Sequence, residues 1–155
     1  MGKYVAAVED HLILPATVRL PDGEELLRER AGRRVPSAVP IRLLIDTGSK
    51  RTTLIPGVVR HLDPRPGSEV RVAAALYAGR ARLFWVRLDF PQAGLAAFDL
   101  VQVARLAMPP DLAQFHGLLG RDLLQRLHEF NYQGRRGRYT LRDTPGLLGW
   151  LRSWL

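Results

Sequence analysis

Strand-like runs of apolar residues follow one another along most of this chain. They cover residues 3–20, 70–77, 81–90 and 98–106, and a shorter apolar run covers 41–45. Alternating apolar and polar residues lie on opposite faces of a strand, so one face of such a strand is suited to a core. Because turns rich in Gly and Pro separate these runs, we predict an all-β protein.

A few segments depart from the strand pattern. Residues 24–40 are charged and contain Gly32 and two prolines, so we expect a loop with a single helical turn at residues 24–30. Pro56 opens a short turn or helix, and residues 121–127 have the pattern of a short amphipathic helix. Residues 129–141 predict a closing hairpin with its turn at 134–137.

The run at 41–45 ends in a group of polar residues that looks like a functional site. It is mostly Ile and Leu, interrupted by Arg42, and it leads into Asp46-Thr47-Gly48-Ser49. An ionised carboxylate at the end of a buried strand is costly unless it is bonded. Glycine allows a sharp turn, and the two hydroxyls can hydrogen-bond a carboxylate or the main chain.

A second segment, Gly117-Leu118-Leu119-Gly120-Arg121-Asp122, lies downstream, with Gly120 74 positions after Asp46. The first group resembles the active-site turn of clan AA aspartic proteases. The second resembles the segment that closes the same fold in retropepsins, the single-lobed members. The resemblance covers about residues 41–141. It implies a closed β-barrel lobe with a flap hairpin, one short helix after the Gly-Arg-Asp segment, and hydrolysis of peptide bonds in a protein or peptide substrate.

The resemblance also implies a role for each residue of the first motif. Asp46 would be the catalytic acid and base, and Thr47 would hydrogen-bond across a dimer axis. Gly48 would leave space beside the carboxylates. Ser49 would hydrogen-bond the Asp46 carboxylate.

In the second motif, Gly120 would pack behind the active-site turn and Arg121 would support the fold or the dimer. Asp122 would start the helix as an acid in its first turn, where a negative charge is favoured.

The flap of this family corresponds in position to the hairpin between residues 70–77 and 81–90. We predict its turn at Ala78-Gly79-Arg80, next to Tyr77, because glycine is common in hairpin turns. The match is one of position only, since a glycine-rich flap tip is absent from the sequence.

The proposed chemistry requires a second carboxylate. Two close carboxyl groups share one proton, so that one acts as general base and the other as acid. The sequence offers one suitable turn, because Pro145 replaces the glycine in the similar Asp143-Thr144-Pro145. We therefore expect a homodimer in which Asp46 and its symmetry mate form one site.

Lys50 and Arg51 follow the motif directly. Two cations there would lower the pKa of the carboxyl pair or select acidic groups of a substrate. The alternative is that both side chains point to solvent.

Composition narrows the other possibilities. The 155 residues are 46% hydrophobic and 25% charged, which suits a single globular domain over residues 1–155, with strands at 3–20 before the core. The net charge is +8, but the arginines are scattered, so a nucleic-acid partner is disfavoured. Cysteine is absent and the four histidines lack metal-ligand spacing, so we expect no cofactor and no metal site.

The termini give two further expectations. Neither a signal peptide nor an apolar run of membrane-spanning length is present in the sequence, so we expect a soluble, cytoplasmic protein. Residues 146–155 are apolar, with Trp150 and Trp154 on one helical face, which predicts a C-terminal helix that docks on its own domain or on a second copy.

Two readings compete with the protease. The fold could serve as a catalytically silent binding or dimerisation module, because fold does not fix function. The other competing reading is a basic protein associated with nucleic acid, whose binding would depend steeply on salt concentration.

Overall fold

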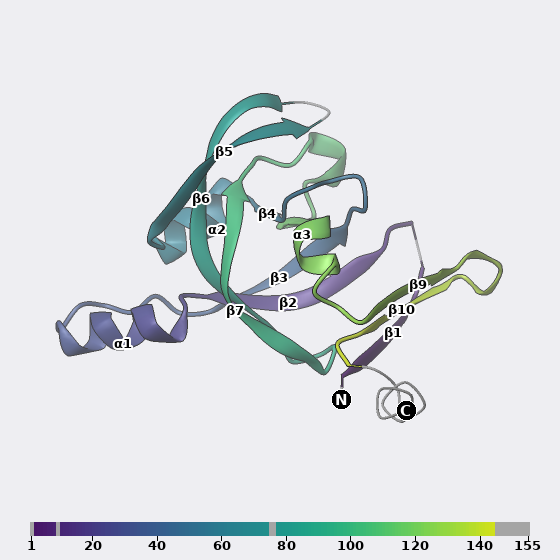
Figure 1. Cartoon of the computed structure of the whole chain (residues 1–155), viewed down its shortest axis with the longest axis horizontal. Coiled ribbons are helices and arrows are strands. Elements are labelled where there is room, and N and C mark those ends of the chain that lie inside the picture. The colour runs from purple at the N-terminus through teal and green to yellow at the C-terminus, as the bar shows by residue number, and fades with distance from the viewer. Residues whose placement is uncertain (1, 9, 75–76, 145–155) are drawn as a thin grey trace, which may run out of the picture.

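A curled sheet forms the body of the molecule. The computed structural model describes residues 2–8, 10–74 and 77–144, and in it a seven-stranded sheet curves until its first strand pairs again with its sixth. In sheet order, the strands are β2 (Ile13–Arg19), β3 (Val39–Ile45), β8 (Gly117–Leu119), β4 (Thr53–Leu54), β7 (Leu95–Arg105), β6 (Tyr77–Phe90) and β5 (Pro66–Ala74). The first six close a barrel, and β5 extends beyond it (Figure 1).

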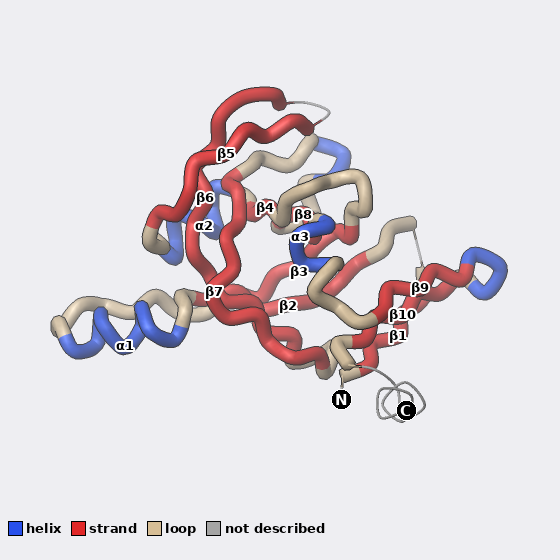
Figure 2. Tube along the Cα trace, viewed as in Figure 1, coloured by secondary structure: helices blue, strands red, loops and turns tan. Residues whose placement is uncertain are grey.

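A smaller sheet and short helices complete the fold (Figure 2). The three-stranded sheet has the order β1 (Lys3–Ala7), β10 (Arg138–Arg142) and β9 (Glu129–Gln133). The helices are α1 (Asp22–Arg30), α2 (Pro56–Leu62) and α3 (Arg121–Leu124), with 3₁₀ turns at Pro110–Leu112 and Gly134–Arg136. The predicted all-β class and closed barrel are confirmed.

The alternation of β3 explains the arginine in its apolar run. Ile41, Leu43 and Ile45 are buried in the barrel, whereas Arg42 between them is exposed. Its guanidinium lies over the ring of Phe115, 5.6 Å from the ring centroid. The strand is therefore half-buried, and Arg42 occupies an outward position where its charge stays in water.

Tyr139 ties the smaller sheet to the barrel. Its hydroxyl donates a hydrogen bond to the Ile13 carbonyl and accepts one from the Ile13 N–H at 3.0 Å. Its ring is 1% exposed and packs edge-on against Tyr4. Burial raises the pKa of the Tyr139 hydroxyl above its usual range, so the group stays neutral and serves as both donor and acceptor.

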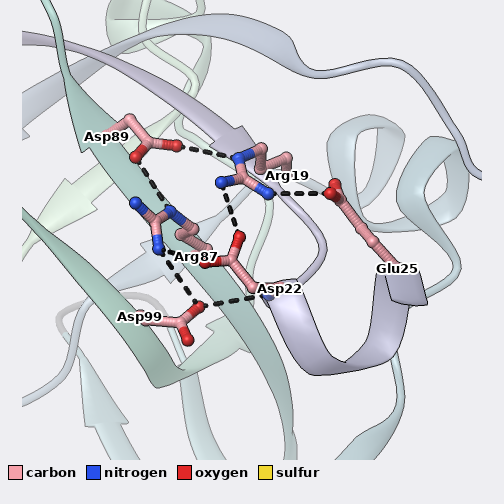
Figure 3. Close-up of polar contacts among 6 residues, drawn as sticks. All are labelled: Arg19, Asp22, Glu25, Arg87, Asp89 and Asp99. Carbon is pink, nitrogen blue, oxygen red and sulfur yellow. Dashed lines mark hydrogen bonds and ion pairs between the residues drawn. The ribbon is translucent and has the colours of Figure 1, made fainter. Parts of the chain in front are cut away.

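Helix α1 replaces the loop predicted for this region and is longer than the expected single turn. It has no buried residue, and Leu27 is 67% exposed, so packing does not hold it in place. Arg19 of β2 instead contacts Asp22 at 2.6 Å and Glu25 at 2.8 Å (Figure 3). The sequence pattern predicted only a helical turn at residues 24–30, and the structure extends it to Asp22, whose carboxylate bonds Arg19 and Arg87 of two strands.

The same network reaches the barrel wall. The Arg19 Nε atom bonds Asp89 at 3.1 Å, and Arg87 bonds both Asp89 and Asp22 (Figure 3). Burial by itself would lower the pKa of Arg19, but the hydrogen bonds that Arg19 donates to Asp22, Asp89 and Glu25 outweigh burial and raise that pKa. Arg19 therefore keeps its charge and joins α1 to β2 and β6.

Two other boundaries differ from the sequence predictions. Helix α3 ends at Leu124, three residues before the expected end. The predicted hairpin turn at residues 78–80 is wrong, because those residues pair within β6 and the last described pair is Ala74 with Tyr77. The observed register pairs Arg71 with Arg80 and Val72 with Gly79, so the glycine that suggested the turn lies inside the ladder. The predicted C-terminal helix at 146–155 lies outside the described residues.

Candidate active site

The two sequence motifs meet because β3 and β8 run side by side. Leu43 pairs with Gly117 and Ile45 with Leu119 in parallel register, so both strands end at the same edge of the barrel. The Asp46 N–H then donates to the Leu119 carbonyl at 3.0 Å. The motifs, far apart in the sequence, are thereby adjacent.

A tight turn holds the Asp46 carboxylate. The Ser49 N–H donates to the Asp46 carbonyl at 3.2 Å, and the Gly48 N–H donates to the Asp46 Oδ1 at 2.9 Å. A Cβ on Gly48 would lie 3.2 Å from that oxygen, closer than an ordinary contact. Glycine therefore allows the main chain to approach the carboxylate, which is half-buried.

The second motif is fastened to the chain that leaves this turn. The Arg121 N–H donates to the Ser49 carbonyl at 2.9 Å, and the Asp122 N–H donates to the Lys50 carbonyl at 3.3 Å. The Asp122 carboxylate accepts from the Thr52 N–H at 3.0 Å, from the Thr52 hydroxyl at 2.8 Å and from the Leu123 N–H at 2.9 Å. Asp122 is therefore a clamp as well as an acid in the first turn of a helix.

Gly120 lies directly against the main chain of Arg51 and Thr52, just before β4. A Cβ at this position would come within 2.6 Å of the Arg51 carbonyl oxygen and 2.8 Å of the Thr52 nitrogen. The Gly120 N–H also donates to the Thr52 hydroxyl at 3.1 Å. Glycine is required here for close approach of two backbones, in line with the role that the resemblance implies.

The hydroxyl of Ser49 is placed differently from the expectation. It donates to the Arg51 carbonyl at 2.8 Å and not to the Asp46 carboxylate. Serine hydroxyls often bond a main-chain carbonyl nearby in the sequence. Here that local bond takes the place of the expected bond to the Asp46 carboxylate. The Thr47 side chain is exposed and makes no hydrogen bond to another described residue.

A cavity of about 660 Å³ opens beside the turn. Its walls include Gly48 and Ser49 of the turn, Leu118 of β8, and Ala78, Gly79 and Arg80 of the hairpin. Three of the predicted flap residues thus border the space next to Asp46, although they lie in a strand. Lys50, Arg51 and Arg121 also line the cavity.

Two participants were not identified from the sequence. Thr52 is fully buried and is the partner of both Asp122 and Gly120, yet a threonine just before a strand is ordinary and carries no local signal. Arg71 of β5 lines the cavity, which depends on hairpin register. Among the described residues, no group of three or more His, Asp and Glu side chains could hold a metal ion.

Comparison with solved structures gives the fold a counterpart. A retropepsin-like aspartic protease from Rickettsia conorii matches with a TM-score of 0.59 over 90% of this chain and 89% of that one. This chain has the fold of a retropepsin-like lobe. The two sequences are 16% identical, so the likeness is one of fold. No protein-family model and no curated protein sequence matches the chain.

In this lobe, the turn after Asp46 and the β5–β6 hairpin border the same cavity. Within the described part of the chain, no helix has both the length and the apolar character needed to cross a membrane.

Proposed function

We propose that this protein is an aspartic endopeptidase whose active site combines Asp46 from two copies of the chain. The observation that carries the proposal is the position of Asp46 within a retropepsin-like lobe. Its carboxylate lies in a glycine turn that is bonded to the Gly120-Arg121-Asp122 segment. The fold and a single carboxylate in this position support a shared site at a two-fold axis.

The remaining candidate for a second carboxylate within the chain is occupied elsewhere. Asp143 accepts hydrogen bonds from the Gly2 N–H at 2.8 Å and from the Ala96 N–H at 2.6 Å. The Asp143 carboxylate therefore holds Gly2 next to β7 and serves to stabilise the fold. This observation supports a second Asp46, supplied by a partner copy, as the missing member of the pair.

In the proposed mechanism, the two Asp46 carboxyl groups share one proton. The ionised group takes a proton from a bound water molecule, which attacks the peptide carbonyl carbon. The protonated group donates to the carbonyl oxygen, which gives a tetrahedral diol. As the C–N bond breaks, one carboxyl group gives its proton to the amine nitrogen and the other takes a proton from a hydroxyl of the diol, so the pair again holds one shared proton. In the same proposal, the exposed Thr47 side chain bonds its counterpart across the axis, which agrees with its having no partner among the described residues.

The first test is cleavage of a denatured protein, followed by mass spectrometry from acidic to neutral pH. We expect the wild type to cleave and Asp46→Asn to be inactive while keeping its fold, because the amide oxygen can still accept from Gly48. Asp111→Asn, at an exposed carboxylate, is the matched control and should cleave normally. Cleavage that survives Asp46→Asn would refute the proposal, and a folded dimer without cleavage would favour the silent binding module.

A second test addresses the dimer. Wild type and Asp46→Asn are unfolded together in equal amounts and refolded, so that subunits mix at random. If each site needs two intact carboxylates, activity should fall to roughly one quarter of the activity of the same total amount of wild type. A fall to one half would instead show that each chain works alone.

A further inference from the structure

The cavity beside the Asp46 turn is lined by positive charge. Five of its described wall residues are basic, and none is acidic: Lys50, Arg51, Arg71, Arg80 and Arg121. They come from three separate parts of the chain, namely the turn after Asp46, the β5–β6 hairpin and the start of α3. The fold therefore gathers charges that are dispersed in the sequence.

Two of these arginines face each other across the hairpin. Arg71 and Arg80 are directly paired in the antiparallel register, and both side chains reach the cavity. Like charges at directly opposite positions destabilise a strand pair. Glu69 offsets part of this repulsion, because its carboxylate lies 4.0 Å from Arg80 at the exposed side of the hairpin.

The other cations are not neutralised within the described chain. No described carboxylate lies within 4.0 Å of the charged nitrogen atoms of Lys50, Arg71 or Arg121, and the same holds for Arg51. The contrast with Arg19 and Arg87, each paired with several carboxylates, is direct. A cleft lined by charge of one sign concentrates its field and attracts groups of opposite charge.

We propose that this cavity selects substrates with glutamate or aspartate side chains close to the bond that is cleaved. The proposal rests on the proposed protease function and adds a substrate class to it. Gly48 connects the two, since it lines the cavity and its N–H bonds the Asp46 carboxylate. A residue of a bound peptide that enters the cavity therefore lies close to the catalytic carboxylates.

The lining favours a peptide over a nucleic acid. Single-stranded nucleic acids are held by stacking of bases on aromatic rings, together with cations. The described walls contain no aromatic residue, and their uncharged part includes Leu106, Leu118 and Ala78. Small apolar surfaces with cations suit the methylene groups and the carboxylate of a glutamate side chain.

Binding is tested with the inactive Asp46→Asn protein, so that the peptides stay intact. Two peptide pools are compared that are identical except that glutamate in one replaces glutamine in the other. We expect the glutamate pool to bind about tenfold more tightly at low ionic strength, with the difference shrinking as salt is added. Equal binding of the two pools would overturn the proposal.

Charge reversal then tests the cavity itself. Arg71→Glu should abolish the preference for glutamate, whereas Arg34→Glu should preserve it. Arg34 is exposed, lies outside the cavity walls and has no described ion pair, so it makes the same change in net charge. Equal losses in both variants would trace the preference to net charge and overturn the proposal. Lys50→Glu takes the place of Arg71→Glu if the latter does not fold.

Two further readouts separate the possible failures. A single-stranded oligonucleotide of matched charge that displaces the glutamate pool better than the pool displaces itself would identify a nucleic-acid site and overturn the proposal. Cleavage sites mapped in a denatured protein should be enriched in Asp and Glu near the cut bond. Cleavage that requires Asp46 but lacks this enrichment would overturn only the present inference. If no cleavage requires Asp46, the protease function is refuted. The preference for glutamate would still be tested by peptide binding to the Asp46→Asn protein.

Discussion

The Asp122 carboxylate accepts hydrogen bonds from both the main-chain N–H and the hydroxyl of Thr52, at 3.0 and 2.8 Å. Thr52 is fully buried, and its hydroxyl oxygen in turn accepts the Gly120 N–H. Through this pair, the segment at 120–122 holds the chain that leaves the Asp46 turn. The neighbours of the turn are therefore fastened by these hydrogen bonds, while the Asp46 carboxylate itself bonds only the Gly48 N–H among the described residues.

Loss of the Asp122 carboxylate should weaken the whole fold. Asp122→Ala leaves the buried N–H and hydroxyl of Thr52 without their acceptor, so we expect a loss of about 2 kcal/mol in the free energy of unfolding. Denaturant titration measures it. Asp111→Ala, at an exposed position, should change the free energy by less than about 0.5 kcal/mol. Equal effects of the two substitutions would contradict the clamp.

Gly120→Ala should be destabilising through overlap with the backbone. The added Cβ would approach the Arg51 carbonyl oxygen to 2.6 Å, and relief of that contact requires the strands to separate. We expect a loss of about 2 to 3 kcal/mol, measured by thermal or denaturant unfolding.

Gly23→Ala in α1 is the matched control for this substitution. No atom lies within 4 Å of a Cβ built there, and alanine is favoured over glycine in a helix by up to about 1 kcal/mol. A stabilised Gly23→Ala beside a destabilised Gly120→Ala is the expected pair of results. A neutral Gly120→Ala would show that the two backbones can move apart cheaply.

Asp143 should contribute stability that disappears in acid. Burial by itself would raise its pKa, but hydrogen bonds from the Ala96 and Gly2 N–H groups outweigh burial and lower it. A carboxyl whose folded pKa is lowered stabilises the fold above its unfolded pKa of about 4, and the contribution is lost as pH falls through the folded pKa. The difference in unfolding free energy between wild type and Asp143→Asn should therefore shrink below about pH 4. A difference that is constant with pH would contradict this assignment.

Arg19→Ala should release α1 without opening the barrel. The helix buries no residue, and the contacts of Arg19 with Asp22 and Glu25 are its ion pairs to β2. Arg28 bonds the Asp63 carbonyl and Glu24 accepts the Arg65 N–H, so we expect the first turn of α1 to be affected most. Amide hydrogen exchange should accelerate in residues 22–30 and stay slow in β2 and β3. Arg30→Ala, at an exposed position of α1 with no described ion pair, should leave exchange unchanged. Acceleration that spreads into β3 would show that the network supports the barrel itself.

Sequence reasoning was strongest where a local pattern has one physical solution. The run at 41–45 was predicted as a strand from its branched apolar residues, and the structure confirms the strand and places Arg42 at an outward position. The closing hairpin also follows its local turn signal, with strands at Glu129–Gln133 and Arg138–Arg142. It was weakest at α1 and at the hairpin turn. The extent of the helix depends on ion pairs from other strands, and the place of the turn depends on the register of β5 with β6.

The sequence by itself determined the all-β class and the turn after Asp46, because strand alternation and glycine turns are local properties of the chain, and the resemblance to retropepsins pointed to the segment at 120–122. Only the tertiary structure decided that Thr52 joins the two motifs and that Ser49 bonds Arg51. It also gathered five cations around one cavity. Such contacts join residues that are distant in the sequence, and they are set by strand register and barrel closure, which depend on the whole chain at once.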